Sequence, residues 1–171
     1  MNEIERAFVV DPRTDIEPYL ARAVRCTALR QAYVAIDDPG GGHVEVRVRS
    51  TDDRQLLTVK GGVGLTRTEV ELPIDAAQAN ALWPLAGDRV IEKLRYTVPL
   101  DTDTDTMEVE LDVYAGRFAG LVMTELEFSD AATALAFEPP AWFGTEVTDD
   151  HRWGNANLAR YGRPDGRNGG V

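Results

Sequence analysis

The chain has a single cysteine, Cys26, no basic block, and no apolar run near the roughly 20 residues of a membrane-spanning helix. A lone cysteine excludes an intramolecular disulfide and is typical of a reducing compartment. The first residues, MNEIERAF, have neither the basic region nor the apolar run of a signal peptide. These absences predict a cytoplasmic protein without a membrane segment.

Positive charge is scarce, because 18 Lys and Arg residues face 29 Asp and Glu residues, for a net charge of −11. Binding to duplex DNA depends on clustered Lys and Arg, so this balance argues against a nucleic-acid partner. An excess of carboxylates suits a protein that holds divalent cations, although it serves plain solubility equally well. The length of 171 residues predicts one domain, over residues 1–161, followed by a flexible, glycine-rich tail over residues 162–171.

The segment from Met107 to Phe128, MEVELDVYAGRFAGLVMTELEF, alternates between apolar and acidic residues around a turn at Ala115-Gly116. Successive strand residues point to opposite faces, so this pattern predicts a β-hairpin with one apolar and one acidic side. The acidic side carries Glu108, Glu110, Asp112, Glu125 and Glu127. For either strand taken alone, an acidic side that meets water is the simplest explanation.

The same alternation recurs along the chain and predicts six further strands, over residues 3–10, 29–36, 43–49, 55–60, 66–72 and 89–100. Sequential strands are joined by turns, without the helical crossovers of parallel sheets, so we expect an antiparallel sheet. Short helices are predicted from residue 14 or 15 to about 24, after Asp75, after Ser129-Asp130, and from residue 148 or 149 to about 161.

Charged residues recur two positions apart on one face of six strands. The pairs are Glu3/Glu5, Arg47/Arg49, Glu69/Glu71, Lys93/Arg95, Glu110/Asp112 and Glu125/Glu127, and Lys60 marks a seventh strand. Eight strands can close into a barrel, and the apolar stripes of the helices need the outside of it to pack on. We therefore predict a mainly β (α+β) fold, an eight-stranded antiparallel β-barrel tunnel with a charged lumen and short helices packed outside.

Such a lumen would combine the ligands for both parts of a metal–phosphate complex. Carboxylate oxygens bind hard Mg²⁺ or Mn²⁺, whereas Arg and Lys bind phosphate oxygens. Cross-strand ion pairs on a solvated face explain Arg47 and Arg49 equally well when their strand is considered alone. Repetition of the pattern over seven strands favours the lumen.

The motifs that carry these charges resemble, in order, those of the CYTH domain or triphosphate tunnel metalloenzyme family. They are EIER, VRVR, LTVKGGVGLTRTEVEL, IEKLRY, ELDVYAG, GLVMTELEF and PPAWFGTEVTDDHRW, between Glu3 and about Ala159. The family fold is an eight-stranded antiparallel tunnel that binds triphosphate-containing substrates with divalent metal. The resemblance implies a CYTH-type domain over residues 1–161 that hydrolyses a linear triphosphate, with inorganic tripolyphosphate as the first candidate.

The resemblance also implies roles for individual residues, with Mg²⁺ or Mn²⁺ as the cofactor. Phosphate contacts are expected from Arg47, Arg49, Lys60, Lys93 and Arg95, and metal binding from Glu3, Glu5, Asp112, Glu125 and Glu127. Glu5, Glu125 and Glu127 are the catalytic candidates, because a metal that they hold would activate or orient the attacking water. Glu69, Glu71 and Glu110 are expected in the same lumen.

Position 7 departs from the family pattern Glu-x-Glu-x-Lys, because this chain has Ala7 where the family has lysine. The change removes one cation from the predicted phosphate site, unless Arg6 or Arg152 has replaced it. Two alternatives stay open: an adenylate cyclase of the same fold, and a polyphosphate- or nucleotide-binding module with little turnover. His43 and His151 lack metal-ligand spacing, so we expect both at the surface.

Overall fold

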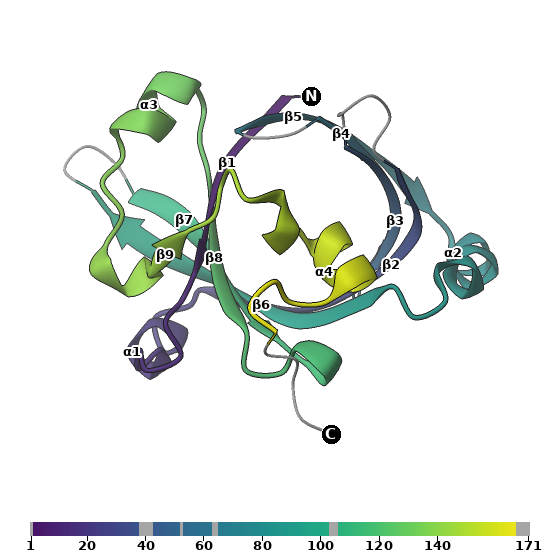
Figure 1. The fold of residues 1–171 in the computed structure, drawn as a ribbon, viewed down its shortest axis with the longest axis horizontal. Coiled ribbons are helices and arrows are strands. Elements are labelled where there is room, and N and C mark those ends of the chain that lie inside the picture. Colours follow the sequence, from purple (N-terminus) through teal and green to yellow (C-terminus); the bar gives the residue numbers. More distant parts are fainter. Residues whose placement is uncertain (1, 38–42, 52, 63–64, 103–105, 167–171) are drawn as a thin grey trace.

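The structure, a computed structural model, describes residues 2–37, 43–51, 53–62, 65–102 and 106–166. Figure 1 shows a strongly curved sheet with a few short helices. The strands of the described part are β1 (Asn2–Val9), β2 (Arg25–Asp37), β3 (Val44–Ser50), β4 (Gln55–Gly61), β5 (Thr66–Ile74), β6 (Val90–Asp101), β7 (Thr106–Tyr114), β8 (Val122–Glu127) and β9 (Thr145–Glu146). The α-helices are α1 (Glu17–Leu20), α2 (Ala76–Leu82), α3 (Ala131–Ala136) and α4 (Asn155–Tyr161), and the 3₁₀ turns are η2 (Trp83–Ala86), η3 (Gly116–Phe118), η4 (Ala141–Phe143) and η5 (His151–Trp153).

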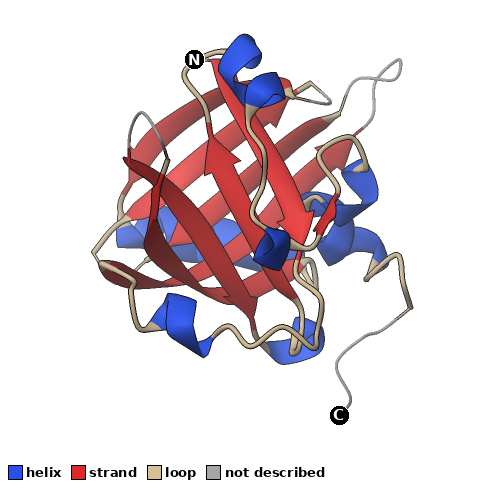
Figure 2. Ribbon diagram, turned by 90° about the vertical axis from the view of Figure 1, so that its left-hand side faces the viewer, coloured by secondary structure: helices blue, strands red, loops and turns tan. Residues whose placement is uncertain are grey.

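The predicted antiparallel sheet is confirmed, with strand order β5-β4-β3-β2-β6-β7-β8-β1-β9. β1 has further neighbours, since residues 5–9 pair with β8 while Asn2, Glu3 and Ile4 pair with β5. Figure 2 shows the strands running obliquely beside one another, with the helices at their ends and margins. Closure into a regular barrel stays a prediction, because within the described ranges the pairing of β1 with β5 extends over three residue pairs.

Local differences from the predicted elements have simple causes. β5 continues through Pro73 and Ile74, beyond its predicted end at residue 72, and Pro73 lies opposite Leu56 of β4. Proline has no N–H to donate, so a strand tolerates it at a position where no second neighbouring strand needs that hydrogen bond. The first helix, expected to reach about Val24, is a single turn, α1. No helix of the described ranges is long and apolar enough to cross a membrane.

The convex face of β1, β7 and β8 forms one hydrophobic core with the helices outside it. Phe8, Leu111 and Leu126 are buried there, and residues of α1 and α3 and the turn η4 pack over them. Trp142 of η4 stacks on Tyr19 of α1 with ring centroids 4.0 Å apart. Asp130 caps α3 by accepting a hydrogen bond from the Thr133 N–H, as the sequence predicts. For these helices, the expected position outside the sheet is confirmed.

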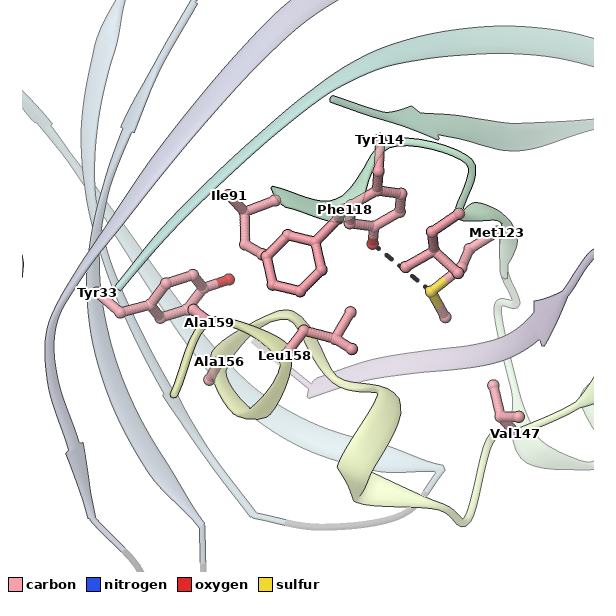
Figure 3. Close-up of a cluster of buried hydrophobic side chains, with 10 residues drawn as sticks. Tyr33, Ile91, Tyr114, Phe118, Met123, Val147, Ala156, Leu158 and Ala159 are labelled. Carbon is pink, nitrogen blue, oxygen red and sulfur yellow. Dashed lines mark hydrogen bonds between the residues drawn. The ribbon is translucent and has the colours of Figure 1, made fainter. Parts of the chain in front are cut away.

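The helix α4 departs from that expectation, because it lies inside the curve of the sheet (Figure 1). Leu158 and two alanines of α4 pack against Tyr33, Ile91 and Met123 of three different strands, as the close-up in Figure 3 shows. An apolar stripe predicts that a helix packs on a sheet without saying on which face. Here the concave face carries apolar side chains at one end, and α4 covers them.

The structure describes residues 162–166 of the predicted tail. Arg163 is buried, and its guanidinium pairs with Asp165 at 2.7 Å. The remaining tail residues, 167–171, lie outside the described residues. The rest of the concave face, away from the apolar end that α4 covers, is charged.

Candidate active site

The charged part of the concave face lines a cavity of about 820 Å³. Most of the side chains expected in the lumen meet here: Glu5, Arg47, Arg49, Lys60, Glu69, Glu71, Arg95, Glu110, Glu125 and Glu127. Lys93 and Asp112 do not line the cavity, since both side chains are fully buried behind it. Glu3 lies in β1 opposite Arg67 of β5, and its side chain is outside the described part of the structure.

The first cluster of cations lies on β3 and β4 beside carboxylates of β5. Lys60 Nζ is 2.7 Å from Glu69 Oε2, and Arg49 Nη1 is 3.1 Å from Glu71 Oε1. The register explains these contacts, because Lys60 lies directly opposite Glu69 in the β4–β5 pair. Cross-strand pairing of this kind relieves the repulsion among the cations.

Arg47 and Arg49 of β3 each retain an unused hydrogen-bond donor. The Nε atoms of Arg47 and Arg49 are buried and have no hydrogen-bond partner in the described structure. Burial and the neighbouring charge of Arg47 lower the pKa of Arg49. Buried donors without acceptors cost free energy, and an anion that enters the cavity would gain charge-assisted hydrogen bonds from the guanidinium groups that line it. This wall of the cavity has the chemistry of a phosphate site.

A second cluster joins β6 to β7 and β8 through Arg95. Its Nε donates to Asp112 Oδ1 at 2.7 Å, and its two Nη groups pair with Asp112, Glu110 and Glu125. Although burial opposes them, Asp112 and Glu125 raise the pKa of Arg95 well above its usual value. Arg95 is therefore a permanent cation at the junction of three carboxylates.

Carboxylates of β1 and β8 form the third group. Glu5 lies opposite Glu127, and Ala7 lies opposite Glu125. Glu5 Oε1 accepts from Arg67 Nη2 at 2.9 Å, and Glu125 pairs with Arg95. Although burial works against ionisation, Lys93 and Arg95 hold the pKa of Glu125 below its usual range. These are hard oxygen donors of the kind that Mg²⁺ and Mn²⁺ prefer. Within the described ranges, no three metal-ligating side chains already converge on one point.

Several cavity residues were not assigned to the site from the sequence. Arg67 shares a strand face with Glu69 and Glu71, a spacing that placed it correctly without suggesting a role. His43 was expected at the surface, and this is wrong, because its side chain is only 15% exposed and Nε2 lies 3.1 Å from Glu45 Oε2. Alternation of HVEVRVR already put His43 and Glu45 on the face of Arg47. His151 is exposed, although it borders the cavity.

The curved antiparallel sheet lines a cavity with paired cations and carboxylates, side chains that suit phosphate and divalent metal, and comparison with known proteins specifies the family. No family model matches the chain. The inorganic triphosphatase of Nitrosomonas europaea is 39% identical over 159 residues, which is 93% of this chain and 97% of the relative. That of Acetivibrio thermocellus is 37% identical over 160 residues, which is 92% of this chain and 93% of the relative.

Solved structures agree with these relatives. A crystal structure of an inorganic triphosphatase superposes with a TM-score of 0.63 at 37% identity, over 92% of this chain and 93% of the other. A Hippeastrum protein described as a candidate adenylyl cyclase that has a dominant triphosphatase activity shares the fold, with a TM-score of 0.52 at 12% identity over 78% of this chain and 82% of the other. The chain belongs to the inorganic triphosphatase family and is a hydrolase of phosphoanhydride bonds in triphosphates.

Proposed function

We propose that the chain is a divalent-metal-dependent tripolyphosphatase of the CYTH, or triphosphate tunnel metalloenzyme, family, with the concave face of its sheet as the tunnel. The observation that carries the proposal is that the cations of β3 and β4 line the same cavity as the carboxylates of β1 and β8. The names of both curated relatives support inorganic triphosphate as the substrate.

Phosphate oxygens bind to the arginine and lysine side chains that face the cavity. Arg47 and Arg49 of β3 line the cavity, and Lys60 lies beside them on β4. Donors that are already fixed in a partly water-excluded cavity stabilise negative charge without further reorganisation. These residues would therefore hold the substrate and neutralise the charge that develops on the departing phosphates.

The carboxylates Glu5, Glu125 and Glu127, with Glu3 at the start of the same strand, would hold the Mg²⁺ or Mn²⁺ ion. When bound, such a metal supplies Lewis-acid stabilisation and activates water. Glu5 and Glu125 are paired with Arg67 and Arg95 in the ligand-free cavity. An arginine that turns to a phosphate oxygen releases its carboxylate for the cation, so the cavity exchanges partners without losing its charge balance.

A substrate screen tests this function. Purified protein is incubated with tripolyphosphate, ATP, thiamine triphosphate or pyrophosphate, each with Mg²⁺ or Mn²⁺, and released phosphate is measured. We expect turnover of tripolyphosphate above the others, and none after a chelator removes the metal. Cyclic AMP formed from ATP would establish the cyclase alternative. Metal-dependent binding of tripolyphosphate in calorimetry, with no product after long incubation, would establish the binding module.

A further inference from the structure

Asp112 differs from the other carboxylates of the concave face, because it does not reach the cavity. It lies on β7 directly opposite Arg95 of β6, and its side chain is completely buried. Glu110 and Glu125, its neighbours on the same face of β7 and β8, both line the cavity. A cation that enters the cavity therefore meets Glu125 and Glu110 before Asp112.

The oxygens of Asp112 are already used by two cations. Oδ1 accepts from Arg95 Nε at 2.7 Å, and Oδ2 accepts from Arg95 Nη2 at 2.6 Å and from Lys93 Nζ. Two parallel bonds from a guanidinium to one carboxylate fix the plane of the guanidinium as well as its position. A metal at Asp112 would have to displace these donors in a place where water cannot replace them.

Lys93 completes the arrangement from the same buried layer. Its side chain is as inaccessible as that of Asp112, and its ammonium lies 5.2 Å from the Tyr114 ring centroid. Burial and the charge of Arg95 lower the pKa of Lys93, and Asp112 opposes both effects. Lys93 and Asp112 thus form a buried pair behind Arg95. Only Arg95 of the three borders the cavity.

We propose that Asp112 is a positioning residue that, with Lys93 as its counter-charge, holds Arg95 in place for the substrate, and that Asp112 itself contacts neither metal nor phosphate. The inference rests on the proposed phosphate-binding role of the cavity. Arg95 is gripped through Nε and Nη2, which leaves Nη1 on the side of Glu110 and the cavity. Without Asp112, Arg95 and Lys93 would repel each other, and only the pairs with Glu110 and Glu125 would still hold the Arg95 guanidinium.

The central test compares substrate affinity with metal affinity in Asp112→Asn. The asparagine keeps the shape of the side chain but cannot accept both guanidinium bonds with full charge. We expect the KM for tripolyphosphate to rise roughly tenfold or more, the change that follows from one lost charge-assisted hydrogen bond. Mn²⁺ binding without substrate, followed by electron paramagnetic resonance, should weaken far less than in Glu127→Gln, because Asp112 reaches the proposed metal ligand Glu125 only through Arg95.

Two reference variants serve as the positive and the negative control for these measurements. Glu127→Gln removes a proposed metal ligand and should weaken Mn²⁺ binding. Glu92→Gln removes the partner of Arg30, 2.9 Å away on the outer face of β6, and should change neither KM nor Mn²⁺ binding. If Glu127→Gln also leaves Mn²⁺ binding unchanged, the metal assignment fails, while the KM of Asp112→Asn still tests the positioning role.

The Lys93→Met and Asp112→Asn changes should not act independently, because they remove two halves of one pair. The KM of the double variant should lie closer to that of either single variant than to the product of their effects. If Asp112→Asn does not fold, Asp112→Glu keeps the charge and displaces Arg95, so its KM should rise with unchanged Mn²⁺ binding. A loss of Mn²⁺ binding equal to that of Glu127→Gln, or an unchanged KM, would overturn the proposal.

Discussion

Glu5 and Glu127 lie directly opposite each other on the antiparallel strands β1 and β8. Opposed like charges on neighbouring strands destabilise a sheet, unless a cation compensates them. Glu5 is compensated by Arg67, whose Nη2 is 2.9 Å from Oε1. The register thus brings two carboxylates together, one of them paired with an arginine, at the place where we propose that the metal binds.

Replacing Glu127 by glutamine should separate the role of its charge in metal binding from the effect of that charge on stability. The amide keeps the shape but removes a charged metal ligand, so we expect metal affinity and turnover to fall at least tenfold, about the smallest effect of disturbing a metal site. The melting temperature should be unchanged or higher, because the repulsion with Glu5 is relieved. Metal titrations of activity and thermal denaturation measure both effects. Unchanged kinetics would show that this face is only solvated.

Arg49→Ala should impair substrate binding more than metal binding. Arg49 borders the cavity, and its Nε has no partner that the substrate would need to displace. Loss of one charge-assisted hydrogen bond should raise the KM for tripolyphosphate roughly tenfold to a hundredfold. The metal concentration for half-maximal activity should change little. Arg30→Ala, on the outer face, is the matched control and should leave both values as they are.

Restoring a lysine at position 7 should strengthen triphosphate binding. Ala7 borders the cavity opposite Glu125. Neither Arg6 nor Arg152 is among the residues that line the cavity, and they pair with Glu146 and Asp150, each at 2.7 Å. The gain from Ala7→Lys should shrink at high ionic strength, because part of it is long-range attraction.

The matched control for this gain is Ala7→Met, which adds similar length without charge and should not reproduce it. Calorimetric titration with tripolyphosphate at two salt concentrations decides the matter. Equal or weaker binding by Ala7→Lys would show that the cavity is already balanced without the lysine.

The Arg6–Glu146 pair should make part of the stability depend on pH. The hydrogen bond from Arg6 holds the pKa of Glu146 below its usual value, so this contribution is present above the unfolded pKa of about 4.3 and is lost as pH falls through the folded pKa. The unsubstituted protein should therefore melt at a higher temperature than Glu146→Gln at pH 7, with the difference shrinking below about pH 4. A difference that stays constant with pH would contradict this origin.

Alternation predicted the strands and the faces of their charged residues, because a period of two is a property of the backbone itself. Glu5, Arg49 and Glu127 accordingly lie in the cavity where the sequence placed them. The two-residue strand β9 was not predicted, because it is too short to show alternation. The inside position of α4 was not predictable either, since helical periodicity does not say which side of a curved sheet needs cover.

The sequence alone does not predict which charged residues pair with one another. Spacing placed Arg95 and Asp112 on the same face of the sheet, but only the register of β6 with β7 sets one against the other. The same register puts Lys93 behind the cavity rather than in its wall. The depth of burial of a side chain depends on how neighbouring strands are offset and on what covers them. The sequence of a single strand predicts neither.

The position of α4 inside the sheet has a consequence for synthesis on the ribosome. Tyr33, Ile91 and Met123 emerge well before Leu158, which covers them. A nascent chain that has already formed its strands would therefore still present apolar side chains on its concave face. Such exposed surface is what chaperones bind and what leads to aggregation. These apolar side chains are shielded from water only after α4 has packed against the concave face.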